Sequence, residues 1–305
     1  MSPESGDRLL LLFIDGVGLG PQQPDINPLA AAATPVLDDL LGGSLTEVRS
    51  PLCRQGLTFT ALDATLGYPG LPQSATGQTT LLTGLNGAAL MGWHYGPWPG
   101  PTLKAALDRG TLFHAALSAG LTACLANAYP PGYFRALEQG RLKPNAPAYA
   151  AMAASLALLD LEAYRQGRAL AADLTGSYLK GLDSSLPAYT PAGAGAALAE
   201  VAAAYHFTFF DFWLPDRLGH RGSWVEALGL VERFDAFLGG LIEHLGSAVT
   251  LLVTSDHGNL EDKSTTSHTR ASVPLLAWGR AAGHFCDLRD LPAVAPAVLQ
   301  ALHLR

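Results

Sequence analysis

The sequence is short of cysteine and of long apolar runs, and each shortage disfavours a class of protein. Its 305 residues include only three cysteines, Cys53, Cys124 and Cys286. Their wide spacing predicts neither a disulfide framework nor a thiolate metal site. No apolar run approaches the roughly 20 residues that a membrane-spanning helix needs. We therefore expect neither a disulfide-rich scaffold nor a membrane partner.

Basic residues are in the minority. The chain carries 19 lysines and arginines against 26 aspartates and glutamates, which gives a formal net charge of −7. General nucleic-acid binding needs a basic face, so no nucleic-acid partner is expected. Some of the acidic side chains are instead available as metal ligands.

The first residues do not predict a signal peptide. Glu4 and Asp7 stand where a basic stretch would be needed, and the apolar run over residues 9–14 is short. Together with the few cysteines, this favours a reducing cytoplasm. The length and the 49% hydrophobic content allow one large α/β domain, or a core with a smaller lobe. No stretch predicts an oligomeric state.

The most informative stretch covers residues 249–259, V-T-L-L-V-T-S-D-H-G-N. The apolar part predicts a fully buried parallel strand, and it ends at Asp256, His257 and Gly258. In open α/β sheets, chemistry takes place just beyond the carboxyl ends of such strands. An acid and an imidazole at this point indicate a metal site, although a polar turn would give the same pattern.

Two more apolar runs end in acids. Residues 9–14 lead to Asp15-Gly16, and residues 206–213 lead to Asp216, with His220 four positions later on the same helical face. The glycines at 16, 18 and 20 are a weak dinucleotide-binding signal, because the acid precedes them instead of following about 20 residues later.

Residues 72–84 place two hydroxyls, Ser74 and Thr76, at the start of a predicted helix over residues 77–83 that Gly84 ends. A hydroxyl there caps free N–H groups. It can also serve as a nucleophile, because the helix N-terminus stabilises an alkoxide and an incoming phosphate. The stretch alone leaves both roles open.

Together these residues predict one metal centre. A sheet that aligns the three strands brings three carboxylates to one rim, where they would raise one another's pKa unless cations neutralised them. Carboxylates and imidazoles together make the mixed oxygen and nitrogen sites that zinc or manganese occupies. Two such ions and one hydroxyl can activate a nucleophile and hold a leaving oxygen. The residues concerned are Asp15, Ser74, Asp216, His220, Asp256, His257 and His268.

The predicted fold is α/β, with a mostly parallel central sheet and helices on both faces. Residues 86–100 are rich in glycine, proline and tryptophan, and residues 181–195 have the composition of a linker. We therefore predict a catalytic core over residues 1–87 and 189–305, with an inserted cap lobe over residues 88–188. His94 lies in the aromatic loop and is either a substrate contact or a structural residue.

The motifs and their order resemble the alkaline phosphatase superfamily, and most of all the metal-binding core of the cofactor-independent phosphoglycerate mutases. The matching pieces span most of the chain: Asp15-Gly16, residues 74–78 (S-A-T-G-Q), residues 216–220 (D-R-L-G-H), residues 254–259 (T-S-D-H-G-N) and residues 267–269 (S-H-T) before Val273-Pro274.

The resemblance implies one metal ion held by Asp216, His220 and His268. It implies a second held by Asp15, Asp256, His257 and the Ser74 oxygen. The ions would be Mn²⁺ or Zn²⁺, with Mg²⁺ as a further option. Ser74 would attack phosphorus and form a phosphoserine, with Thr76 as the rival nucleophile. Thr76, Gln78 and His94 are candidate substrate contacts.

The resemblance leads to the hypothesis of a phosphohydrolase acting on a small phosphorylated metabolite. An intramolecular phosphomutase, a phosphodiesterase or nucleotide pyrophosphatase, and a non-catalytic metal-stabilised binding module remain as alternatives. The predicted insert is much shorter than that of the mutases, and its basic residues do not match theirs. Thr76 and Gln78 replace the proline and arginine typical of sulfatases.

Overall fold

The computed structural model describes residues 6–304, without the side chain of Val48. Glu4, one basis of the expectation about the N-terminus, lies outside this range. No helix in residues 6–304 is long and apolar enough to cross a membrane.

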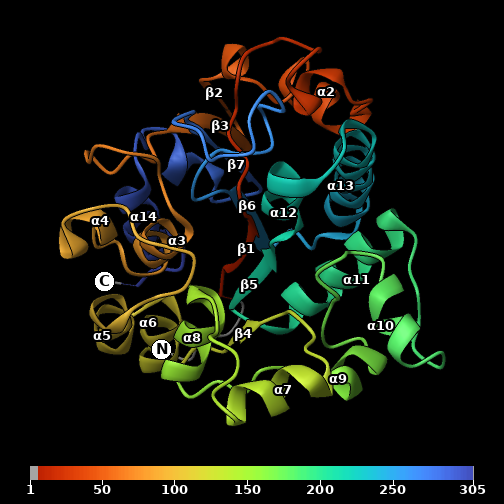
Figure 1. Ribbon diagram of the computed structural model, residues 1–305. Helices are drawn as coiled ribbons and strands as arrows, with labels where there is room; N and C mark the ends of the chain where they lie inside the picture. Colours follow the sequence, from red (N-terminus) through yellow and green to blue (C-terminus); the bar gives the residue numbers. More distant parts are fainter. Residues whose placement is uncertain (1–5, 305) are drawn as a thin grey trace.

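A single seven-stranded sheet divides the molecule (Figure 1). Its strand order is β2-β3-β7-β6-β1-β5-β4. Four neighbouring strands are parallel: β6 (Val249–Thr254), β1 (Arg8–Ile14), β5 (Phe207–Phe212) and β4 (Ala123–Leu125). The remaining pairings are antiparallel and involve β7 (Val273–Trp278), β3 (Leu57–Leu62) and β2 (Leu52–Arg54).

The predicted α/β fold is confirmed, and "mostly parallel" describes only part of the sheet. The sequence of residues 273–278 is as apolar as that of a parallel strand, because β7 is buried between two other strands. Apolar composition reports burial on both faces and carries no information on strand direction.

The central strands are buried on both sides because their residues alternate between two apolar clusters. Leu9, Leu11 and Phe13 of β1 belong to one cluster. Leu10, Leu12 and Ile14 belong to the other. This period of two is what a strand between two helical layers requires.

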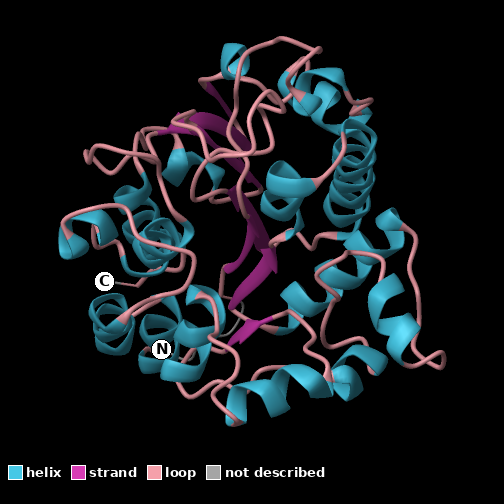
Figure 2. Cartoon of the chain, in the orientation of Figure 1, coloured by secondary structure: helices cyan, strands magenta, loops and turns pink. Residues whose placement is uncertain are grey.

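Helices cover both faces of the sheet (Figure 2). On one side lie α11 and α13, which approach closely at two glycines. A Cβ atom on Gly195 would lie 2.1 Å from the Phe237 carbonyl oxygen, and one on Gly240 would lie 2.1 Å from that of Ala192. On the other side, α3, α5, α6, α8 and α14 surround the first cluster (Figure 1).

The α-helices run as follows: α1 Pro28–Ala31, α2 Pro35–Leu41, α3 Ser74–Thr83, α4 Gly87–Met91, α5 Pro101–Arg109, α6 Leu112–Ser118, α7 Pro131–Glu138, α8 Ala146–Ala153, α9 Leu161–Arg165, α10 Ser177–Leu182, α11 Pro191–Ala204, α12 Leu214–Arg221, α13 Trp224–His244 and α14 Val294–Ala301. The predicted helix start at residue 77 is three residues late, since Ser74 already opens α3.

The division into a core and a lobe over residues 88–188 stays a prediction, to which the structure adds three facts. β4 comes from this segment and forms an edge of the central sheet. A small separate apolar cluster, which includes Ala128, Tyr164, Leu179 and Leu186, lies farther along the segment. Helix α8, also in this segment, packs on the first cluster.

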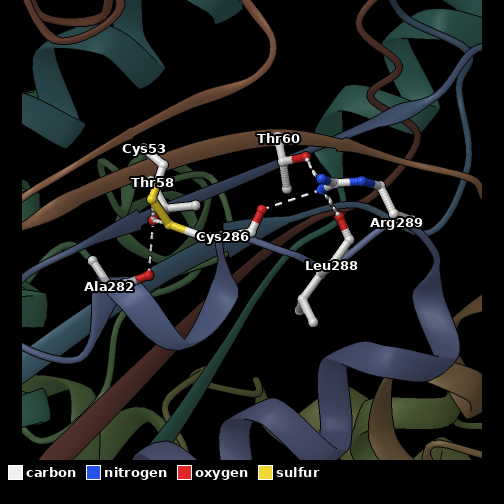
Figure 3. The surroundings of a disulfide bond; sticks show 7 residues. All are labelled: Cys53, Thr58, Thr60, Ala282, Cys286, Leu288 and Arg289. Atoms are coloured by element: carbon white, nitrogen blue, oxygen red, sulfur yellow. Dashed lines mark hydrogen bonds between the residues drawn. A yellow bond between two sulfur atoms is a disulfide. The ribbon is translucent and has the colours of Figure 1, made fainter.

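The prediction that the cysteines form no disulfide is wrong. Cys53 and Cys286 are joined (Figure 3), with their Cα atoms 5.9 Å apart. Cys53 lies in β2, and Cys286 follows the short 3-10 helix over Ala282–Phe285. The pairing of β3 with β7 brings these segments together across 233 residues, a distance that cysteine spacing cannot reveal. The argument for a reducing compartment from cysteine usage therefore loses its basis.

Candidate metal centre

The predicted site residues meet at the carboxyl ends of the parallel strands. Asp15 directly follows β1, Asp256 follows β6 by two residues, and Asp216 lies in the first turn of α12 just after β5. The amide of Asp15 donates to the carbonyl of Phe212 at 3.1 Å, which extends the β1–β5 pairing to the rim itself. Parallel strands thus place three acids side by side, as their sequence positions predict.

The first ligand group consists of Asp15, Asp256 and His257, all buried. Nε2 of His257 lies 3.4 Å from Oδ1 of Asp15 and 3.6 Å from Oδ2 of Asp256. The hydroxyl of Ser74 lies 2.9 Å from the same nitrogen. One imidazole nitrogen therefore faces two carboxylates and a hydroxyl.

The second ligand group consists of Asp216, His220 and His268. Oδ1 of Asp216 lies 3.4 Å from Nε2 of His220 and 3.5 Å from Nε2 of His268. The rings of His257 and His268 are stacked, with their centroids 3.8 Å apart. The two groups are therefore adjacent, and together with Ser74 they contain every metal ligand that the sequence predicts.

Backbone carbonyls fix the orientation of the histidine rings. Nδ1 of His220 lies 2.6 Å from the Thr266 carbonyl oxygen, and Nδ1 of His268 lies 2.7 Å from that of Pro72. A carbonyl can only accept, so each Nδ1 carries a proton, and in the neutral ring each Nε2 then presents a lone pair. Those two Nε2 atoms lie 3.0 Å apart. Two facing lone pairs repel unless a cation is shared between them.

The electrostatics of the first group also call for positive charge. Burial and the nearby Asp216 carboxylate raise the pKa of Asp256 to about 7. Burial and the Asp256 carboxylate raise the pKa of Asp15. Burial and the neighbouring His268 lower the pKa of His257 to about 3, so its ring is neutral. Neutral imidazole beside crowded carboxylates is the state in which these groups bind a cation.

The residues present fit two divalent ions. Oδ1 of Asp15 is buried and has no hydrogen-bond partner, which is costly for a carboxylate unless a ligand satisfies it. Each group offers two kinds of donor, carboxylate oxygen and imidazole nitrogen, and the first adds a hydroxyl. Such mixed sets suit zinc or manganese.

Comparison with known proteins supports this description. Residues 189–305, which carry five of the seven predicted ligands, match the family model described as the Metalloenzyme superfamily. The match covers 117 of the 305 residues. It includes β5, β6, α12 and the loop with His268.

Curated relatives match over a similar extent. The 2,3-bisphosphoglycerate-independent phosphoglycerate mutase of Moorella thermoacetica is 33% identical over 117 residues, which cover 36% of this chain and 23% of that protein. The phosphopentomutase of Syntrophotalea carbinolica is 42% identical over 90 residues, which cover 28% of this chain and 21% of that protein. The chain thus spans less than a quarter of the length of these relatives.

Solved structures share the fold over nearly the whole chain. The alkaline phosphatase from the Antarctic bacterium TAB5 superposes with a TM-score of 0.58 at 13% identity, covering 98% of this chain and 99% of that one. A Leishmania mexicana phosphoglycerate mutase gives 0.52 at 14% identity, covering 98% and 96%. The expected resemblance to the alkaline phosphatase superfamily is confirmed at the level of the fold, which is alkaline-phosphatase-like.

Within residues 189–305, two residues that the sequence did not single out form hydrogen bonds that hold the candidate ligands or their loops in place. Nδ2 of Asn259 donates to Oδ1 of Asp216 at 2.7 Å. The buried Glu261 carboxylate accepts from the amides of Gly18 at 2.9 Å and Asn259 at 2.8 Å. Asn259 ends the D-H-G-N motif and could have been found from it, whereas Glu261 stands in a stretch that reads as a polar loop.

Glycine is required where the ligand strands meet. Gly16 adopts φ +71°, and a Cβ atom there would lie 2.6 Å from Cβ of Asp216. A Cβ atom on Gly77 would lie 2.8 Å from Cβ of Asp256. Both positions let the backbone of one ligand segment touch the side chain of another.

Gln78 and Thr76, the two candidate substrate contacts in α3, both form hydrogen bonds to other protein groups. Nε2 of Gln78 donates to Oδ2 of Asp15 at 3.2 Å and to Oδ2 of Asp256 at 3.1 Å, which orients both carboxylates. The Thr76 hydroxyl donates to the Gln73 carbonyl at 2.9 Å and is fully buried.

His94 lies in the loop that follows α4. Burial lowers its pKa, and both ring nitrogens are buried without a hydrogen-bond partner. Its surroundings, near the backbone of Thr65 and Tyr68, include no member of the two ligand groups. Its role as a substrate contact stays a prediction.

Proposed function

We propose that this chain is a dinuclear-metal phosphohydrolase that releases phosphate from a small phosphorylated metabolite through a phosphoserine. The observation that carries the proposal is the position of Ser74. Its hydroxyl opens α3 and lies 2.9 Å from Nε2 of His257, among the ligands of the first group. A nucleophile held inside a metal-ligand group is the arrangement that metal-assisted phosphoryl transfer requires.

Asp216, His220 and His268 would hold one ion, and Asp15, Asp256, His257 and Ser74 the other. When bound, the two ions would favour the alkoxide of Ser74 and neutralise charge that develops on the phosphate oxygens. Asn259 and Gln78 would keep the carboxylates in place through the hydrogen bonds described above. Glu261 would fix the loop that carries Asn259.

The covalent chemistry consists of two displacements. The Ser74 oxygen forms a bond to phosphorus while the ester P–O bond breaks, and the leaving oxygen takes a proton to become the free alcohol. Water then forms a new P–O bond as the bond to Ser74 breaks. Inorganic phosphate leaves and the serine hydroxyl is regenerated, so atoms and charge balance.

The contacts favour Ser74 over Thr76 as the nucleophile. The Thr76 hydroxyl donates to a carbonyl within its own turn, and its side chain contacts no ligand group among the hydrogen bonds described. Ser74 is 7% exposed whereas Thr76 is 0% exposed, so a substrate would reach Ser74 more readily.

An intramolecular phosphomutase is the second candidate. Two of the relatives reported above are named as mutases. The same phosphoserine would pass its phosphoryl group to a second hydroxyl of the substrate. Product analysis separates the two candidates, because hydrolysis yields free phosphate and a mutase yields a positional isomer.

The deciding experiment combines metal loading and turnover. The protein is purified without chelator, reloaded with Mn²⁺ or Zn²⁺, analysed for metal content and incubated with p-nitrophenyl phosphate. We expect two ions per chain, release of phosphate, and a protein mass increased by one phosphoryl group in wild type but not in Ser74→Ala. Ser177→Ala, on exposed α10, is the matched control. Two bound ions without turnover of any phosphomonoester would contradict the proposal and favour the binding-module alternative.

A further inference from the structure

A large cavity lies next to the metal centre. Its volume is about 1020 Å³, at the upper end of the range for small-molecule sites. Asn127, which follows β4, and Asp211, in β5, both line it. So does Arg217, the residue after the proposed ligand Asp216. The cavity therefore lies at the same rim of the sheet as the metal ligands.

Asp211 is a buried carboxyl group that the proposed chemistry does not use. It is 2% exposed, and Nδ2 of Asn145 donates to its Oδ2 at 2.6 Å. Its Oδ1 is buried and has no hydrogen-bond partner. Burial raises its pKa to about 7. An unsatisfied carboxyl oxygen costs free energy, and a ligand that brings an N–H group would remove that cost.

Asn127 fixes the backbone of Asp211 beside the cavity. Oδ1 of Asn127 accepts from the Asp211 amide, and its Nδ2 donates to the Asp211 carbonyl, both at 2.8 Å. The side chain thus continues the pairing of β4 with β5 beyond the last strand residue. The backbone of Asp211 is held on both sides.

Aromatic rings form a wall of the cavity. The rings of Tyr129 and Tyr133 lie with their centroids 4.4 Å apart, and both residues line it. The charge of Asp211 contributes to raising the pKa of both phenols, after the larger effect of burial. Flat aromatic groups stack well on such surfaces, and here they would do so within reach of the carboxyl group.

The charged residues of the cavity differ in burial. Arg141, Lys143 and Arg217 are exposed, Asp173 is half-buried and Asp211 is buried. Arg217 follows the proposed ligand Asp216, which favours a ligand whose phosphate end lies towards the metal centre, and the Asp211 acceptor favours a hydrogen-bond donor at the other end. A ligand suited to this cavity therefore has an anionic end and a flat end that carries N–H groups.

We propose that the cavity binds the organic part of the substrate, and that this part is a flat nitrogen heterocycle, as in a nucleoside monophosphate. Asp211 accepts from an N–H of the ring, and Tyr129 and Tyr133 pack against its face. This assignment rests on the proposed function and names its substrate class. A phosphorylated three-carbon acid or a bare pentose phosphate could donate a hydroxyl to Asp211, but it would leave the aromatic wall without a flat partner.

The test compares guanosine 5′-monophosphate with ribose 5-phosphate, which shares the phosphate and the sugar but has no base. With the metal-loaded enzyme, we expect kcat/KM for the nucleotide to exceed that for the sugar phosphate about 100-fold or more, since a site built around a hydrogen-bond donor rejects analogues that lack it. Asp211→Asn and Tyr133→Ala should each reduce this ratio at least about tenfold. Equal kcat/KM values for the two compounds would overturn the assignment.

Asp235→Asn is the matched control. Asp235 is also a 2% exposed carboxyl group, but it accepts from the amides of Val36 and Leu37 in α2, away from the cavity. The substrate ratio should stay as in wild type. A fall in the ratio as large as that of Asp211→Asn would mean that loss of any buried carboxylate disturbs the site, and would overturn the specific role of Asp211.

Direct binding separates this inference from the proposed function. Calorimetric titration of guanosine into the metal-free protein needs neither metal nor turnover. Binding that Asp211→Asn weakens at least about tenfold, in a protein that cleaves no phosphomonoester, would support the cavity and refute the hydrolase. Cleavage of p-nitrophenyl phosphate without guanosine binding would leave the hydrolase in place and overturn the cavity assignment.

Discussion

The hydroxyl of Ser74 lies 2.9 Å from Nε2 of His257, although 183 residues separate them in the sequence. The contact joins the first turn of α3 to the loop that follows β6. It makes Ser74 part of a ligand group whose other members come from two neighbouring strands. The Ser74 oxygen therefore lies both at the N-terminus of α3 and beside the candidate metal ligands.

Replacement of this serine gives the first prediction. Ser74→Ala should lower kcat by about 10³-fold or more, because loss of the nucleophile removes the covalent path and leaves only binding and electrostatic effects. Most of the bound metal should remain, since three other ligands surround that ion. Phosphate release and elemental analysis on the same sample measure both effects. Full activity in Ser74→Ala would transfer the nucleophile to Thr76 or to water.

The second prediction concerns the ligand group on α12. Asp216→Ala should lower the metal content from two ions per chain to about one, because Oδ1 of Asp216 is the atom that both His220 and His268 face. Removal of one of three protein ligands leaves too few donors for a stable site. The exposed Asp39→Ala on α2 is the control. Unchanged metal content would refute the ligand assignment.

Removal of both ions should destabilise the fold. Ions that bind only the folded protein contribute about 2.7 kcal/mol when their free concentration is 100 times Kd. Without them, the buried carboxylates of Asp15 and Asp256 lose the charge that neutralises them. A chelator should therefore lower Tm, and added Mn²⁺ should restore it in a concentration-dependent way. A Tm that the chelator leaves unchanged would contradict occupancy of the buried site.

The sequence predicted that the three acids would gather at one rim because each comes after an apolar run. Asp15, Asp216 and Asp256 stand just beyond buried strands, and parallel pairing brings such positions together without further information. Glu261 was missed because burial of a carboxylate in a loop depends on which amides surround it. Gln78 was predicted to contact substrate, whereas its amide nitrogen is bonded to two ligand carboxylates.

The parts of the fold that escaped prediction depend on contacts between distant segments. The direction of β7 is set by its pairing with β6 and β3, and its apolar sequence fits either direction. The link from Cys53 to Cys286 follows from the same pairing. Short α4 lies in a stretch rich in glycine and tryptophan, where Asn86 caps the helix by accepting from the Ala89 amide at 2.9 Å.

The disulfide gives a prediction about stability. Reduction of the bond between Cys53 and Cys286 should lower the free energy of unfolding by about 2–5 kcal/mol, because the bond closes a long loop in the unfolded chain. Urea unfolding with and without reductant measures the difference. The double replacement Cys53→Ser/Cys286→Ser should lower stability by a similar amount and make it insensitive to reductant. A wild type that responds to reductant no more than this double variant would show that the bond does not form in solution.

The last prediction follows from the raised pKa of Asp211, which is about 7 in the folded protein against an ordinary value of 3.8. The folded state retains a proton that the unfolded state has already released, so this group favours folding below about pH 4 and loses that contribution as the pH rises towards 7. Asp211→Asn stays neutral at every pH. Wild type should therefore lose stability relative to the variant between about pH 4 and 7, by at most about 4 kcal/mol. Urea unfolding of both proteins across this range measures the difference, and a pH-independent difference would show that Asp211 is ionised in the folded state.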